Sequence, residues 1–157
     1  MLIKAKTYLS SPFKAGKLSE SSENSEEEKE LYHISAHLHD IGKITELEGP
    51  IVFKYSTKGK LIGHISIMAS EIERAGIELG ITSEIPLLLQ HSILAHHGQL
   101  DYGSPVLPVT AEALLLSLVD NLDSKMVIAL KALEETKEGE FSNKVYPLDG
   151  RTLYKHK

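Results

Sequence analysis

The chain has 157 residues, the size of one globular domain, and its composition already excludes several classes of protein. It contains no cysteine, which rules out disulfide bonds and thiolate metal sites. A formal net charge of -5 argues against a broad basic face for coating nucleic acid or anionic membranes, but a local basic patch would still fit a nucleic-acid substrate. The sequence has no apolar run of roughly 20 residues and no signal-peptide pattern, so we expect a cytoplasmic protein without a membrane partner.

The chain begins with a segment, residues 1–30, that we expect to lie outside the main domain. Its second half, residues 19–30, has no apolar residue and carries six glutamates, which is typical of a solvated acidic linker. Asn24 or Ser25 would cap the helix that follows, with glutamates in its first turn. The remaining residues, 31–157, are expected to form one domain.

Four segments with apolar residues at three- and four-residue spacing predict helices. The first starts in the acidic run and ends near Asp40, with Gly42 as its C-terminal break. The other three are expected at about 64–79, at 83–97 with Ser83 as cap, and at 110–137 with Thr110 as cap.

The segment between the first two helices has a different pattern. IVFKY, STKGK and LI predict a two-stranded hairpin with strands at residues 51–55 and 60–62. Residues 99–109 read as an ordered loop, and the tail after Gly139 as extended or rich in turns. The expected fold class is therefore all-α, a helical bundle with one small β-hairpin insertion.

Histidines and a carboxylate stand at the predicted helix ends. Adjacent helical residues point about 100° apart, so His39 and Asp40 can reach one ion only near a helix end. His96 and His97 repeat this arrangement just before Gly98. In the absence of cysteine, such ligands suit Mn, Fe, Zn or Mg-type ions. The competing interpretation is structural, with each histidine bonding a helix-end carbonyl or complementing the helix dipole.

Three further residues are candidates for the same site. His64 follows a glycine at a predicted helix start, where its ring would lean into a cleft or merely cap an exposed end. Asp120 stands in the apolar run LVDNL, where a carboxylate is costly unless it is paired or bound to metal. Lys43 would reach a substrate phosphate, or would act as an ordinary cation at a helix C-terminus.

The string LHDIGK resembles the signature of the HD superfamily of metal-dependent phosphohydrolases. The segments LHDIGKITELEGP, YSTKGKLIGHI, HSILAHHGQLDYGSPVLPVTAEA, VDNLDSKM and FSNKVYPLDGRTLYK are similar, in order and spacing, to the YhaM-type 3′→5′ exoribonucleases. This resemblance covers about residues 31–157 and implies an HD-domain bundle. It implies catalytic roles for Asp40 and Lys43 and the following metal ligands: His39, Asp40, His64, His96, His97 and Asp120.

The chain departs from the family pattern before the HD pair. The family has a metal-binding histidine on an earlier helix and an N-terminal oligonucleotide-binding domain, whereas residues 1–32 contain no histidine. His33 or His37 could substitute, and His37, three residues before Asp40 on the same helical face, is the stronger candidate. The alternatives are a ligand from another subunit, a water molecule, or a weakened metal site in a degenerate binding protein.

The resemblance implies a metal-dependent phosphodiester hydrolase, similar to a 3′→5′ exoribonuclease and acting on single-stranded RNA or short oligonucleotides. Mn²⁺ is the favoured cofactor, with Mg²⁺, Fe²⁺, Co²⁺, Ni²⁺ and Zn²⁺ as alternatives. Two other hypotheses are a nucleotide phosphohydrolase and a catalytically degenerate module that binds metal or nucleotide. A homo-oligomer is one assembly compatible with the sequence.

Overall fold

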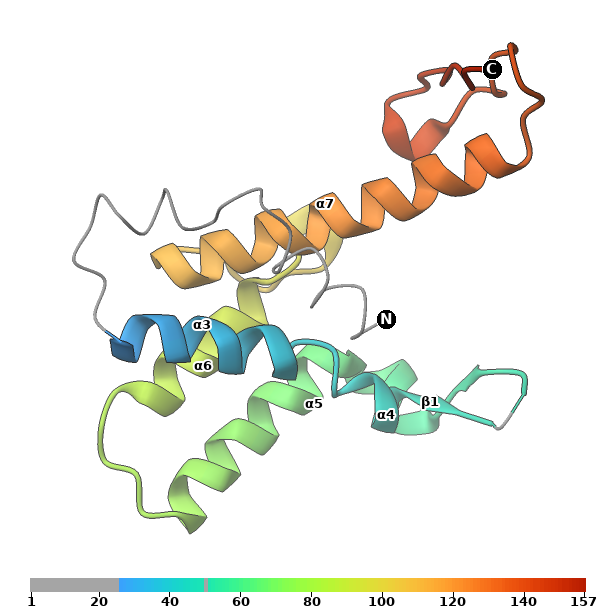
Figure 1. Ribbon diagram of the computed structural model, residues 1–157. Coiled ribbons are helices and arrows are strands. Elements are labelled where there is room, and N and C mark those ends of the chain that lie inside the picture. Colours follow the sequence, from blue (N-terminus) through green and yellow to red (C-terminus); the bar gives the residue numbers. More distant parts are fainter. Residues whose placement is uncertain (1–25, 50) are drawn as a thin grey trace. The chain divides into compact units, whose positions relative to one another are not determined.

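The computed structural model describes residues 26–49 and 51–157, so the cap expected at Asn24 or Ser25 lies outside the described residues. The described part is mostly helical and has one two-stranded antiparallel sheet (Figure 1), which confirms the predicted fold class. The elements in chain order are α3 (Glu26–Leu38), α4 (Lys43–Glu46), β1 (Leu47–Glu48), β2 (Lys54–Tyr55), α5 (Thr57–Glu78), α6 (Ile85–Ala95), the 3₁₀ turn η1 (Leu100–Tyr102), α7 (Ala111–Glu134) and the 3₁₀ turn η2 (Tyr146–Leu148).

The core of the first part of the chain forms where α6 packs against α5 and α3. Met68, Ile72 and Ile93 are its buried cluster, and Leu38 and Leu89 pack against them. Full burial of an apolar side chain of this size stabilises the folded state by about 1.5–3 kcal/mol. Leu38, Met68 and Ile93 lie within four residues of His39, His64 and His96, respectively. Core packing therefore also fixes the backbone that carries these histidines.

The small sheet lies earlier in the chain than the sequence predicted. Leu47 pairs with Tyr55 and Glu48 with Lys54, whereas the expected second strand, 60–62, is part of α5. The cause is Ser56, whose hydroxyl accepts the N–H of Gly59 at 2.8 Å and caps a helix at that point. STKGK therefore starts a helix instead of forming a turn.

Helix α5 consists of two helical parts joined by a kink at Gly63. The backbone there has φ 76° and ψ 155°, a left-handed value of φ that favours glycine. The second part of α5 begins at His64, which is the start predicted for this helix. The bend thus separates a short N-terminal piece, unforeseen in the sequence, from the predicted helix.

Two predicted helix caps have different outcomes. Thr110 caps α7, since its Oγ1 accepts the N–H of Ala113 at 3.2 Å. The prediction for Ser83 was wrong, because α6 begins one residue later, after Glu84, and Pro86 occupies its first turn. Proline needs no N–H partner in that position, so the helix start does not depend on a side-chain cap.

Contacts divide the chain into two compact units, with the boundary between Ser117 and Leu118 inside α7. The second unit contains the rest of α7 and a tail in which single bridges join Phe141 to Tyr154 and Val145 to Arg151. This agrees with the predicted extended, turn-rich tail. Among the residues that the structure describes, no helix combines the length and apolar content needed to cross a membrane.

Candidate metal centre

Four histidines from three segments converge beside the core. The ring of His96 lies edge-on to those of His39, His64 and His97, with centroid distances of 5.3, 5.7 and 4.3 Å. Potential ligand atoms of His64, His96 and His97 all lie within 4.8 Å of one another. Neutral imidazoles gathered in this way form a donor set for a divalent cation.

Asp40 adds a carboxylate to this group. Its Oδ2 lies 3.7 Å from Nε2 of His39, and its Oδ1 lies 4.0 Å from Nε2 of His64. The same Oδ1 is 2.6 Å from the ammonium nitrogen of Lys43, one helical turn later in the chain. The HD pair and the lysine predicted from the sequence thus meet His64 in one place.

All four histidines use Nδ1 in a hydrogen bond to a carbonyl or carboxylate oxygen. The acceptors are the Ala36 carbonyl for His39 at 2.9 Å, Oε1 of Glu46 for His64 at 3.2 Å, the Ile93 carbonyl for His96 at 2.6 Å and the Tyr102 carbonyl for His97 at 2.7 Å. A neutral ring with such a partner carries its proton on Nδ1, which leaves the lone pair on Nε2. This is the usual outer-shell arrangement of metal-binding histidines.

His64 gives the most direct indication that these residues fit a cation. Its Nε2 is buried and has no hydrogen-bond partner within the described part of the chain. A buried polar atom without a partner is costly, and a metal ion is one group that would satisfy it. Together with the chemistry of the donor set, this atom supports a divalent metal at the centre.

Gly42 holds the HD loop directly against the backbone of His64. A Cβ atom placed on Gly42 would lie only 2.3 Å from the carbonyl oxygen of His64. Gly42 itself has ordinary helical angles, φ -54° and ψ -24°, and it precedes α4. The sequence interpretation of Gly42 as a helix-breaking residue was therefore wrong, because the glycine is required by close packing and not by its backbone angles.

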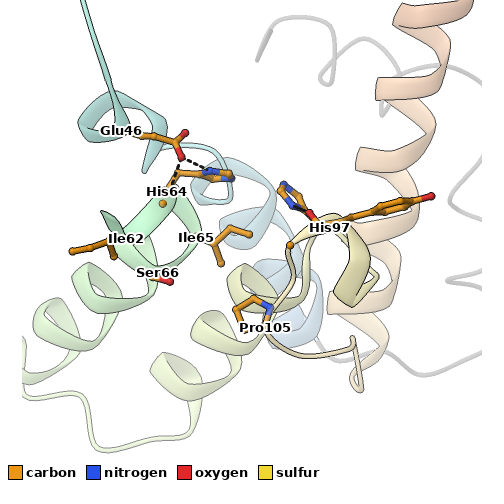
Figure 2. A pocket seen from close by; sticks show the side chains of 10 residues that line it. Glu46, Ile62, His64, Ile65, Ser66, His97 and Pro105 are labelled. Atoms are coloured by element: carbon orange, nitrogen blue, oxygen red, sulfur yellow. Dashed lines mark hydrogen bonds and ion pairs between the residues drawn. The ribbon is translucent and has the colours of Figure 1, made fainter. Parts of the chain in front are cut away.

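A pocket of about 250 Å³ opens next to His64 and His97 (Figure 2). It lies between the bend of α5 and the loop that carries η1. Its lining combines the two rings and Glu46 with apolar and hydroxyl groups, from Ile62, Gly63, Ile65, Ser66, Tyr102, Gly103 and Pro105. The pocket thus lies immediately beside two of the candidate metal ligands.

Two of the predicted site residues stand apart from this description. His37 is exposed on α3, and its Nδ1 bonds the carbonyl of His33 at 2.6 Å, outside the ring contacts of the four converging histidines. Asp120 is half-buried on α7 and belongs to the second unit, and its place among the ligands stays a prediction.

Glu46 is the residue that sequence reasoning missed. Its side chain is buried and its carboxylate bonds His64 twice, at the backbone N–H and at the ring. The only sequence signal was a carboxylate beside apolar residues in ITELEG, and that signal also fits Glu48, which is exposed. The helical turn of α4 and the strand after it decide which of the two acids faces inward.

Comparison with known proteins agrees with this geometry. The HD domain family matches residues 12–125 of the chain, well over half of its length. The chain belongs to the HD domain family. The resemblance of LHDIGK and the later motifs to this family is thereby confirmed.

Three curated relatives carry the name 3'-5' exoribonuclease YhaM. The protein of Bacillus pumilus (strain SAFR-032) is 47% identical over 128 residues, which are 82% of this chain and 41% of the relative. That of Geobacillus sp. (strain WCH70) is 46% identical over 127 residues, 81% and 39% of the two chains, and that of Bacillus subtilis (strain 168) is 46% identical over 128 residues, 82% and 41%. The chain spans about two fifths of the length of these relatives. No solved structure gives a significant match.

Proposed function

We propose that this chain is the catalytic domain of a metal-dependent phosphodiester hydrolase that removes nucleotides from the 3′ end of single-stranded RNA. The observation that carries the proposal is the convergence of four histidines, each with Nδ1 bonded to an oxygen, with the carboxylate of Asp40 beside His39 and His64. The direction of attack and the RNA substrate rest on the names of the curated relatives, which are 3'-5' exoribonucleases.

The proposed cation is Mn²⁺. The proposed ligands follow the C-terminal ends of α3 and α6, stand at the bend of α5, and include one residue of α7. A bound divalent cation would supply an activated water and would polarise a phosphoryl oxygen. The case for Asp120 rests on the sequence, in which it stands in the run LVDNL and matches a metal ligand that the family resemblance implies. The full proposed set is His39, Asp40, His64, His96, His97 and Asp120.

The protein's own groups would position the substrate and balance its charge. Lys43 is held 2.6 Å from Asp40 with its side chain 38% exposed, so its ammonium can meet an incoming phosphate without leaving the carboxylate. The pocket beside His64 and His97 would seat the sugar and base of the terminal nucleotide, with Ile65 and Pro105 as apolar walls. A phosphodiester bound in this way would lie against the candidate metal ligands.

The proposal is tested with end-labelled single-stranded RNA and added Mn²⁺. We expect stepwise shortening from the 3′ end with release of mononucleotides, and we expect Asp40→Ala to abolish it. Glu73→Ala, which removes an exposed carboxylate elsewhere on α5, is the matched control and should retain the activity. Folded wild-type protein that leaves RNA intact would contradict the proposal, and hydrolysis of free nucleotides alone would support a nucleotide phosphohydrolase instead.

A further inference from the structure

We propose that Glu46 is a positioning residue that selects the ring tautomer of His64 and directs its Nε2 toward the cation. This inference rests on the proposed metal centre, and it adds a residue to which sequence reasoning gave no role. It concerns the free protein as well as the metal-bound one, since a tautomer is set before any cation arrives.

One oxygen of Glu46 holds His64 at two points. Oε1 accepts the backbone N–H of His64 at 3.0 Å and the ring Nδ1–H at 3.2 Å (Figure 2). The first bond fixes the backbone at this position, and the second fixes the rotation of the ring and the nitrogen that carries the proton. The remaining nitrogen, Nε2, is the buried atom without a hydrogen-bond partner among the described residues.

The bend of α5 makes the first of these bonds available. Gly63 leaves the helical conformation, so His64 begins the second part of the helix with an N–H that is not in a regular helical ladder. A carboxylate is the preferred partner at such a start, because it also meets the positive end of the helix dipole. Glu46 therefore caps the second part of α5 and also orients the ring of its first residue, His64.

Glu46 is itself held firmly by its backbone. Its N–H donates to the Gly42 carbonyl at 3.0 Å, and its carbonyl accepts the N–H of Ser56 at 2.8 Å. Gly59 packs so closely that a Cβ there would lie 2.3 Å from that carbonyl oxygen. With only 8% of the residue exposed, its carboxylate has little freedom to turn toward water.

Glu46 differs from the other three Nδ1 partners in being a side chain. His39, His96 and His97 bond backbone carbonyls, which no substitution removes. Of these four Nδ1 bonds, the one at His64 is therefore the one that a side-chain substitution can remove.

The first test reads the tautomer in metal-free protein. Nitrogen-15 spectra of the histidine rings, recorded above the pH range of imidazole titration, distinguish protonated from unprotonated ring nitrogens. We expect His64 to carry its proton on Nδ1 in the wild type and in Glu46→Gln, whose amide oxygen still accepts. In Glu46→Leu the preference should be lost. Glu48→Leu, at the exposed acid two residues later, is the matched control and should leave the spectrum unchanged.

The second test measures Mn²⁺ affinity by calorimetry in the same variants. Glu46→Leu should weaken binding by about 10- to 100-fold, the usual effect of losing an outer-shell partner, and Glu46→Gln by less than about tenfold. Should the leucine variant not fold, Glu46→Asp withdraws the carboxylate by one methylene and should show the same losses. An unchanged tautomer and affinity with a lowered unfolding temperature would overturn the inference, because Glu46 would then be only a helix cap. Since the tautomer is read without substrate, this outcome is independent of whether RNA is hydrolysed.

Discussion

Replacing Gly42 by alanine tests how closely the HD loop must approach α5. The added methyl group would lie 2.3 Å from the carbonyl oxygen of His64, 3.0 Å from its carbonyl carbon and 3.1 Å from its Cα. All three atoms belong to the backbone, so no side chain can turn aside to make room. Relief of the clash requires the loop that carries His39 and Asp40 to move away from His64.

The size of the effect follows from two opposing terms. Overpacking by one methyl group costs about 1–3 kcal/mol, and here the upper half of that range applies because backbone must move. The alanine regains about 0.4–1 kcal/mol by restricting the unfolded chain, since Gly42 has helical angles that alanine adopts freely. The net loss of about 1–2.6 kcal/mol corresponds to a Tm lower by roughly 2–10 °C in a domain of this size.

The assay is thermal unfolding together with Mn²⁺ titration. Gly76→Ala is the matched control, because its methyl group would meet the ring of Pro86 at 3.0 Å, in α5 but away from the histidines. We expect both variants to lose stability and only Gly42→Ala to lose metal affinity, by at least about tenfold, as for a displaced ligand shell. Gly42→Ala protein with wild-type stability and wild-type affinity would refute the reasoning.

Three further predictions follow from individual contacts. Lys43→Gln should lower kcat/KM for RNA by about ten- to a hundredfold, because a bond to a charged group contributes about 1.5–3 kcal/mol. Mn²⁺ affinity, measured in parallel, should change by less than about tenfold, because glutamine can still donate a hydrogen bond to Asp40. Equal losses of both would refute a role at the phosphate. Burial raises the pKa of Tyr32, so the unfolded chain releases this proton first, and the free energy of unfolding should fall as pH rises above about 10. Tyr32→Phe should remove that part of the fall in urea titrations, and identical pH profiles would contradict the assignment. Ser56→Ala removes the cap of α5 and should lower the free energy of unfolding by about 0.5–2 kcal/mol in the same assay, whereas no change would show that the hydroxyl contributes nothing.

The sequence predicted the parts of this molecule that depend on periodicity and on motif position. Apolar spacing located the helices because their buried faces repeat every three or four residues. The histidines were predicted at helix ends, and two such ends and the bend of α5 do bring His39, His64 and His96 together. In each case the information is local, so one short stretch of sequence is sufficient.

What the sequence did not predict depends on contacts between distant segments. STKGK can form a turn or a helix start, and the buried hydroxyl of Ser56 decides between them by bonding Gly59 and the Thr45 carbonyl. The bond between Glu46 and the backbone N–H of His64 depends on the bend at Gly63, 17 residues later. The need for glycine at position 42 is visible only when the backbone of His64 lies against it.

The central claim is that the converging histidines form a metal centre, and Mn²⁺ titration of three proteins tests it most directly. We compare the wild type with His97→Ala, which removes one converging ring, and His37→Ala, which removes an exposed ring on α3. Loss of an outer-shell partner typically weakens metal binding by about 10–100-fold, and His97→Ala, which removes a ligand itself, should weaken Mn²⁺ binding by more than that. His37→Ala should bind Mn²⁺ as the wild type does. Wild-type binding by His97→Ala, or a loss confined to His37→Ala, would contradict the account.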